Sequence, residues 1–114
     1  MRLVIIESPY AGFVARNVAY ARAAMVDCLK RGEAPFASHI LYPHPDVLRD
    51  GVPEDRQLGI RAGLAWAEHA DATVVYEDLG VTEGMLAGIE HAAKFGRPVE
   101  HRSLPGWSAL RGVE

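Results

Sequence analysis

The stretch Arg2-Leu-Val-Ile-Ile-Glu-Ser-Pro-Tyr-Ala-Gly12 decides how the rest of the chain is interpreted. Its four consecutive apolar residues, Leu3 to Ile6, favour a strand, because Val and Ile are stiff at χ1 and pack well on a pleated surface. An unbroken apolar run is typical of a strand buried on both faces, as in a parallel sheet. Ligands bind at the carboxyl ends of strands in open α/β sheets. We therefore expect the polar loop from Glu7 to Tyr10 to form one wall of a site.

The rest of the chain alternates helical and strand patterns. Apolar spacing and helix-end signals predict helices over residues 12–31, 53–69 and 83–95. Short β-rich runs predict strands over residues 34–41, 72–76 and 98–101. The alternation predicts an α/β fold, a flavodoxin-like or Rossmann-like three-layer sandwich with a small parallel sheet of about four strands in the order 2-1-3-4. In that order the loops after Ile6 and Tyr76 face each other across a cleft.

The second strand and the connection after it carry polar residues that bear on the site. Pro35 weakens the start of this strand, because proline is tolerated in a sheet at an edge or at a first residue. We therefore expect an edge strand with Ser38 and His39 near its C-terminal end. Residues 42–52 form the longest irregular connection, and such loops are often functional. Thr82 is the expected N-cap of the last helix.

Composition and charge narrow the classes of function. The 114 residues suit one domain, which we expect over residues 1–102, followed by a tail over residues 103–114 that packs Trp107 onto the body and then frays. The net charge of −3 gives no electrostatic footprint for nucleic acid or an anionic membrane. No apolar run approaches the roughly 18 residues of a membrane span. The single cysteine, Cys28, favours a reducing, cytoplasmic setting, and its apolar helical context favours a buried side chain.

Two carboxylates at strand ends are the candidate catalytic groups. Glu7 ends a buried strand, where a carboxylate is costly unless it serves a purpose. Asp78 lies just after the strand that ends at Tyr76, on the other side of the expected cleft. Each also has a structural interpretation: Glu7 would cap the first helix or pair with Arg16, and Asp78 would cap its own loop.

Several polar and small residues are candidates for binding a ligand. The helix N-terminus from Thr82 to Met85 offers free N–H groups to a phosphate or carboxylate, and Gly80 and Gly84 allow a ligand close to that backbone. The first loop and the edge strand add Ser8, Pro9, Tyr10, Ser38 and His39. The alternative roles are turn formation for Ser8 and Pro9, packing for Tyr10, and a backbone hydrogen bond for His39. The other histidines lack ligand spacing, so the sequence predicts neither a metal site nor a cofactor.

Glu90 is a third carboxylate that needs an interpretation. It shares a helical stripe with Glu83, Ala87 and Lys94, apart from the apolar stripe of the same helix. Glu90 and Lys94 also form a favourable i,i+4 pair with the acid first. A solvated face therefore explains Glu90 better than catalysis does.

Two parts of the chain resemble the nucleoside 2-deoxyribosyltransferase-like superfamily. They are the opening Ile-Glu-Ser-Pro-Tyr and the segment from Asp78-Leu-Gly80 through Gly-Ile-Glu-His-Ala92 to Gly96-Arg-Pro98-Val. The whole chain looks more like a small uncharacterised branch, common in actinobacteria and their phages, with the pattern E-S-P-Y-A-G, G-E-x-P-x-x-S-H and D-x-G-[IV]-[ST]-x-G-M-x-x-G. These motifs match residues 7–12, 32–39 and 78–88. The resemblance implies a flavodoxin-like fold that is usually oligomeric.

The resemblance also implies a position for a catalytic residue. Enzymatic members use a glutamate nucleophile that forms a covalent deoxyribosyl intermediate, and it lies eight residues before the glycine of a G-x-P-V ending. Counting back eight from Gly96 reaches Gly88, which we include among the ligand-binding residues. The family's E-x-G is inverted here as Gly88-Ile-Glu90, and two helical positions turn a side chain by about 200°. We hypothesise that Glu7 is a relocated carboxylate.

Three functions remain open on the sequence. The first is an enzyme that transfers or hydrolyses at the N-glycosidic bond of a nucleoside or nucleotide. The second is a non-catalytic nucleotide-binding module of the same fold. The third is a small interaction protein with a vestigial pocket. We expect a homodimer or higher homo-oligomer, supported by small-residue helix faces at Gly59, Ala62, Gly63, Gly84 and Gly88.

Overall fold

A four-stranded parallel sheet forms the centre of the structure, a computed structural model that describes residues 1–108. The strands are β1 (Arg2–Glu7), β2 (Glu33–Phe36), β3 (Ala72–Tyr76) and β4 (Val99–Arg102). They lie in the order β2-β1-β3-β4, and each neighbouring pair is parallel. This arrangement confirms the predicted α/β class and strand order. It also makes β1 and β3 the two central strands.

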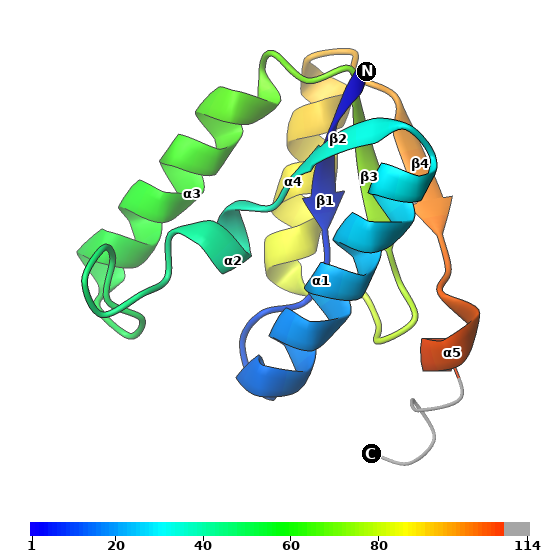
Figure 1. Cartoon of the computed structure of the whole chain (residues 1–114). Helices are drawn as coiled ribbons and strands as arrows, with labels where there is room; N and C mark the ends of the chain where they lie inside the picture. Colours follow the sequence, from blue (N-terminus) through cyan, green and yellow to red (C-terminus); the bar gives the residue numbers. More distant parts are fainter. Residues whose placement is uncertain (109–114) are drawn as a thin grey trace.

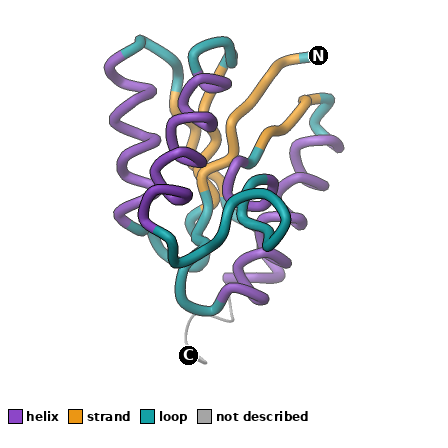
Figure 2. Tube along the Cα trace, turned by 90° about the vertical axis from the view of Figure 1, so that its left-hand side faces the viewer, coloured by secondary structure: helices purple, strands orange, loops and turns teal. Residues whose placement is uncertain are grey.

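Helices cover both faces of this sheet. They are α1 (Val14–Lys30), α2 (Ser38–Leu41), α3 (Pro53–Ala67), α4 (Glu83–Lys94) and α5 (Pro105–Ser108). Figure 1 shows α1 in front of the sheet and α4 behind it, and Figure 2 shows helices on both sides of the strands. The long helix α3 packs against α4 and against the short helix α2. The sheet is therefore the middle of three layers, with α1 on one face and α3 and α4 on the other.

The core forms because both central strands are buried on both faces. All five residues of β3 are buried, and so are Val4, Ile5 and Ile6 of β1. Tyr20, Ala24 and Cys28 of α1, all fully buried, complete one side of this cluster. The unbroken apolar run is therefore explained by two-sided burial. Cys28 is a free, buried cysteine, as predicted.

The second strand is shorter than predicted. β2 ends at Phe36, where it pairs with Ile5, and residues 38–41 form the helical turn α2 instead of continuing the strand. The Phe36 ring packs against Trp66 of α3, with ring centroids 5.3 Å apart. An edge strand has one neighbour to hold it, so this contact directs the chain toward α3. Ser38 and His39 consequently lie on a helical turn and not in the sheet.

The helix boundaries follow the end signals in the sequence. α3 begins at Pro53 as predicted, with Glu54 and Asp55 in its first turn. Thr82 is the N-cap of α4, and its Oγ1 accepts a hydrogen bond from the N–H of Met85 at 3.3 Å. The first helix begins at Val14 and not at Gly12, which adopts a positive φ of 96° in the preceding turn.

The segment after β4 packs onto the α1 side. The ring of Trp107 lies edge-on to that of Tyr20, with centroids 5.2 Å apart. The predicted fraying of the last residues falls at 109–114, outside the described residues. In the described part of the chain, no helix has both the length and the apolarity needed to cross a membrane.

Candidate functional site

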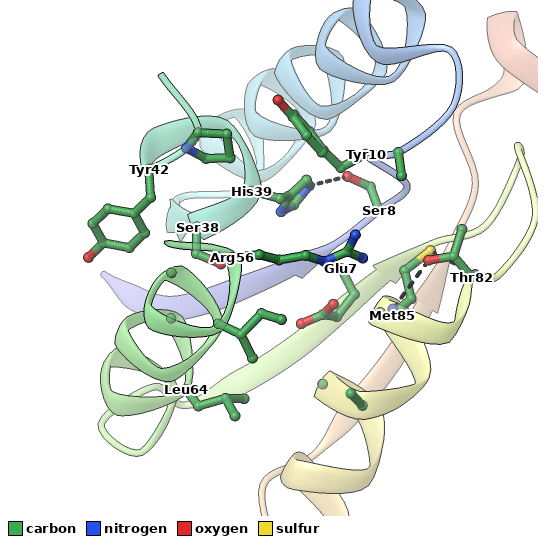
Figure 3. Close-up of a pocket in the computed structure, with 18 of the residues that line it drawn as sticks. Glu7, Ser8, Tyr10, Ser38, His39, Tyr42, Arg56, Leu64, Thr82 and Met85 are labelled. Atoms are coloured by element: carbon green, nitrogen blue, oxygen red, sulfur yellow. Dashed lines mark hydrogen bonds between the residues drawn. The ribbon is translucent and has the colours of Figure 1, made fainter. Parts of the chain in front are cut away.

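A cavity of about 410 Å³ opens beyond the carboxyl end of β1, between α2, α3 and α4 (Figure 3). It is lined by most of the residues that the sequence singled out, namely Glu7, Ser8, Tyr10, Ser38, His39, Thr82, Gly84, Met85 and Gly88. Pro9, Asp78 and Gly80 do not line it. The loop after β1 therefore forms one wall, and the short helix α2 supplies the adjoining part of the rim.

The carboxyl group of Glu7 fills the space that a side chain at position 88 would need. A Cβ built on Gly88 would clash with the carboxyl carbon and Oε2 of Glu7 and would lie 2.9 Å from Oε1. Real Cβ atoms essentially never approach another heavy atom that closely. Gly88 is buried in the second turn of α4, facing the end of β1. The glycine is therefore what allows the carboxyl group of Glu7 to lie against this helix.

Burial governs the charge of Glu7. It raises the pKa of this carboxyl group from its usual value to about 8, while the nearby positive charge of Arg97 acts in the opposite direction. Within residues 1–108, no group donates a hydrogen bond to the Glu7 side chain. The group is therefore predominantly protonated at neutral pH in the empty cavity. A carboxyl group with a pKa near neutrality can change its proton state during a reaction.

Arg97 is a site residue that the sequence analysis missed. Its guanidinium is buried and donates to Thr73 Oγ1 at 2.9 Å and to the carbonyl oxygen of Ala67 at 2.8 Å. These contacts fix a positive charge under the cavity. Thr73 pairs with Val99, so residue 97 lies next to the start of β3 and beside the end of α3, a placement that depends on strand register and not on a pattern in the sequence.

Ser8 and His39 form a hydrogen-bonded pair on the rim. Ser8 Oγ lies 2.7 Å from His39 Nε2. Burial lowers the pKa of His39 to about 4, so the imidazole is neutral at physiological pH. Figure 3 shows this pair above Glu7, joining the loop after β1 to α2. The hydrogen-bond partner of His39 is therefore the Ser8 side chain, in place of the backbone group considered from the sequence.

Small residues of α3 let α2 approach the site. A Cβ built on Gly63 would lie 2.6 Å from Ser38 Oγ and 2.8 Å from Ser38 Cβ, and one on Gly59 would lie 3.2 Å from Leu48 Cδ1. Gly84 also lines the cavity. Gly59, Gly63 and Gly88, which we expected on a dimer surface, thus accommodate neighbouring side chains within the chain, whereas Gly84 is exposed.

Asp78 does not face Glu7, contrary to the expectation from the sequence. Its carboxylate accepts hydrogen bonds from Tyr20 Oη at 2.6 Å, Ser103 Oγ at 2.6 Å and the N–H of Leu104 at 2.8 Å. These partners belong to α1 and to the segment after β4. Asp78 is 4% exposed and lies away from the cavity. Its geometry explains it as a buried structural carboxylate.

The remaining predicted residues have structural explanations. Gly80 has a positive φ of 95°, and its N–H donates to the carbonyl oxygen of Glu77 at 3.0 Å, which closes the turn after β3. Pro9 is buried inside the loop after β1. The N–H of Met85 is already used by the Thr82 cap, so the first turn of α4 offers fewer free donors than expected. Glu90 is exposed and lies outside the cavity.

One face of α3 supplies further lining residues that sequence reasoning missed. Arg56, Ile60 and Leu64 line the cavity at helical spacing, and Figure 3 shows the Arg56 side chain pointing into it. Tyr42 joins them from the loop, and its hydroxyl accepts a hydrogen bond from Trp66 Nε1 at 3.1 Å. The periodicity of 3.6 residues predicted this helix but could not tell which stripe faces a cavity and which faces a core.

Two solved structures share this fold at low sequence identity. A 2-deoxyribosyltransferase from Bacillus psychrosaccharolyticus aligns with a TM-score of 0.61 and 19% identity, covering 89% of this chain and 72% of its own. A 2-deoxyribosyltransferase from Leishmania mexicana aligns with a TM-score of 0.59 and 16% identity, covering 90% of this chain and 65% of its own. These alignments establish the fold that the sequence resemblance implied.

The sequence comparisons give a family but no activity. No curated protein sequence matches the chain. Residues 2–102 match a family described as a domain of unknown function, DUF7768. This match extends from the first residue of β1 to the last residue of β4 and so includes every side chain of the cavity. The chain belongs to the DUF7768 family.

Proposed function

We propose that the protein is an enzyme that transfers or hydrolyses at the N-glycosidic bond of a nucleoside or nucleotide, with Glu7 as its catalytic carboxylate. The observation that carries the proposal is the position of the Glu7 carboxyl group in the space left by Gly88. The resemblance described above implies a nucleophilic glutamate at that helical position. Glu7 brings the same functional group to the same place from β1 instead of α4.

The structural neighbours support the choice of reaction. Both are named as 2-deoxyribosyltransferases, a name for enzymes that transfer a deoxyribosyl group. Their identities of 19% and 16% carry the fold, so the activity of this chain is a proposal that rests on its own site. A cavity of about 410 Å³ falls in the range of about 300–1,000 Å³ that is usual for small-molecule sites.

The proposed reaction begins with an attack by the ionised Glu7 carboxylate. One oxygen of Glu7 bonds to C1′ of the sugar while the C1′–N bond breaks. The electron pair of that bond leaves with the base, which takes a proton from solvent. A carboxylate close to C1′ stabilises the oxocarbenium-like charge that develops there, as in glycoside hydrolysis. Water or a second base then takes the sugar and restores Glu7. The fixed charge of Arg97 favours the ionised form that starts this cycle.

The test is a thermal-shift screen combined with chromatographic detection of free base. The panel contains the common 2′-deoxyribonucleosides, the ribonucleosides and their 5′-monophosphates. Free base that is abolished in Glu7→Gln and retained in Glu90→Gln supports the proposal. Glu90 is a matched control, because it is an exposed carboxylate on α4 outside the cavity. A thermal shift without any free base would replace the enzyme with the non-catalytic binding module.

Three further proposals concern the domain extent, the oligomeric state and the cellular setting of the protein. We propose a single domain over residues 1–102, a homo-oligomer in solution, and a cytoplasmic setting. The extent of the family match, residues 2–102, supports the first, and the free, buried Cys28 supports the third. Light scattering of the purified protein measures the oligomeric state directly.

A further inference from the structure

We infer that Ser8 and His39 form a proton relay that activates the acceptor, water in the simplest case, which releases the sugar from Glu7. This inference rests on the proposed function, because it assigns the second half of that reaction. The two side chains are hydrogen-bonded to each other and line the same cavity as Glu7.

The chain itself places the relay next to the carboxyl group. Ser8 directly follows Glu7, and both residues line the cavity. Ser8 is 5% exposed, so its side chain is almost entirely shielded from bulk solvent. In the tautomer with the proton on Nδ1, His39 Nε2 accepts the hydrogen bond from Ser8 Oγ across 2.7 Å. The lone pairs of Ser8 Oγ then remain available for a proton from an acceptor molecule in the cavity.

A dedicated packing contact holds His39 over Ser8. The helix α2 has four residues, too few to be stable alone, so tertiary contacts must fix it. The close approach of Ser38 to Gly63 supplies such a contact, since any side chain at position 63 would clash with Ser38. His39 is the next residue on the same turn. The absence of a side chain at Gly63 thus allows α2 to bring the imidazole to the cavity rim.

His39 is also the best-placed group to accept a proton. Among residues 1–108, it is the one imidazole that lines this cavity. Glu7 is occupied by the sugar during the second step. The carboxylates of Asp50, Asp55 and Glu83 also line the cavity, but among the described residues the hydrogen-bond partner of Ser8 Oγ is His39. Because burial keeps His39 neutral, its Nε2 lone pair is available at physiological pH. Departure of the sugar restores a negative charge on Glu7, which favours a positive imidazolium across the cavity.

The step balances as a hydrolysis. A water proton passes to Ser8 Oγ while the hydroxyl proton of Ser8 passes to His39 Nε2. The water oxygen bonds to C1′, the bond between C1′ and the Glu7 oxygen breaks, and its electron pair returns to the carboxylate. The products are the free sugar, ionised Glu7 and protonated His39. The proton on His39 then leaves to solvent, and the relay is restored.

The experiment separates the two half-reactions. Rapid mixing with the panel compound that is turned over gives the burst of free base, which reports the first step, and the steady-state rate, which reports sugar release. In His39→Gln and Ser8→Ala we expect a burst within about threefold of wild type and sugar release slowed about 100-fold, the low end of general-base effects. Intact-mass measurement then shows the sugar accumulating on the protein. His69→Gln, an exposed histidine just beyond α3, is the matched control and leaves both steps unchanged.

Other results would overturn the relay. If the two variants lose the burst and the steady-state rate equally, or keep both, then the pair does not act in sugar release. Melting temperatures identify any variant that fails to fold, and Ser8→Ala, which removes one oxygen atom, then carries the test. Added imidazole should restore sugar release to His39→Ala, a rescue that a purely structural role would not show. A wild-type protein that releases no base from any compound contradicts the proposed function itself.

Discussion

Glu7 and Asp78 are two carboxylates at the ends of the two central strands, yet the structure uses them in opposite ways. Asp78 turns toward α1 and accepts hydrogen bonds from Tyr20, Ser103 and Leu104. Glu7 turns toward α4, receives none within the described residues, and has its pKa raised to about 8. A fully hydrogen-bonded carboxylate stabilises the fold, whereas an unsatisfied one in a cavity is costly. The role of each of these strand-end carboxylates therefore depends on the face of the sheet toward which its side chain turns.

The largest effect we expect is the loss of activity in Glu7→Gln. The amide keeps the shape of the side chain but cannot supply the carboxylate oxygen that bonds to C1′. Turnover should fall by about 10³-fold or more, as expected for a lost nucleophile. Release of base is the measurement, with Glu90→Gln as control. A variant that keeps more than a tenth of wild-type turnover, a loss below about 1.4 kcal/mol, contradicts the catalytic role.

Asp78→Ala should instead damage stability. It leaves the buried hydroxyl of Tyr20, the hydroxyl of Ser103 and the N–H of Leu104 without this acceptor, and we expect a loss of about 3 kcal/mol in the free energy of unfolding. Urea denaturation measures this loss. Asp46→Ala is the exposed control and should change the free energy by less than about 0.5 kcal/mol. If Asp78→Ala lowered the activity per folded molecule as far as Glu7→Gln does, the contrast between a structural Asp78 and a catalytic Glu7 would be wrong.

Gly88→Ala tests the same comparison from the helix side. The new Cβ would displace the Glu7 carboxyl group, which is the end of a flexible side chain, so stability should change little while turnover falls about 100-fold. Gly106→Ala in α5 is the matched control, because Gly106 does not line the cavity and a Cβ there would meet nothing within 4 Å. Equal turnover in the two alanine variants would show that the position of the Glu7 carboxyl group does not matter for the reaction.

The smallest effect is a pH dependence of stability. The folded-state pKa of Glu7, about 8, lies above its ordinary value, so its contribution is fully present at low pH and is lost as pH rises through 8. Burial lowers the pKa of His39 and of His91. Their contributions to the free energy of unfolding therefore change with pH only below about pH 6.5, outside this interval. Between pH 6.5 and 8 the wild type should lose about 1 to 2 kcal/mol of its free energy of unfolding, measured by urea denaturation.

Glu7→Gln supplies the control for this pH dependence. Its amide does not titrate, so the slope between pH 6.5 and 8 should disappear, and the variant should become more stable than wild type at pH 8. The Asp78 carboxylate stays in place in this variant, which keeps the comparison within one protein. An unchanged slope in Glu7→Gln would show that Glu7 ionises normally in the folded protein.

The sequence predicted the strands better than the direction of their flanking side chains. The apolar runs of β1 and β3 identified both central strands, because burial on two faces leaves a signal in composition. No comparable signal showed that Asp78 turns toward Tyr20 while Glu7 turns toward Gly88, since that depends on contacts with distant helices. Local patterns therefore located the candidate groups without assigning their partners.

The errors at β2 and α3 have the same physical origin. The strand that we expected over residues 34–41 ends at Phe36, because the aromatic contact with Trp66 draws the chain off the sheet edge. The glycine at position 63 was assigned to a surface, although it accommodates Ser38 inside the chain. Both outcomes depend on long-range packing, which a pattern within one segment does not contain.

The most direct test of the central claim is to trap the sugar on the protein. Wild-type protein is mixed with a 2′-deoxyribonucleoside that it turns over, denatured during the burst, digested with trypsin and analysed by mass spectrometry. The tryptic peptide over residues 3–16 contains Glu7 as its one acidic side chain, whereas Asp78 and Glu90 fall together in the peptide over residues 62–94. We predict one deoxyribosyl group on the peptide 3–16. A deoxyribosyl group on the peptide 62–94 and none on 3–16 would contradict the role of Glu7.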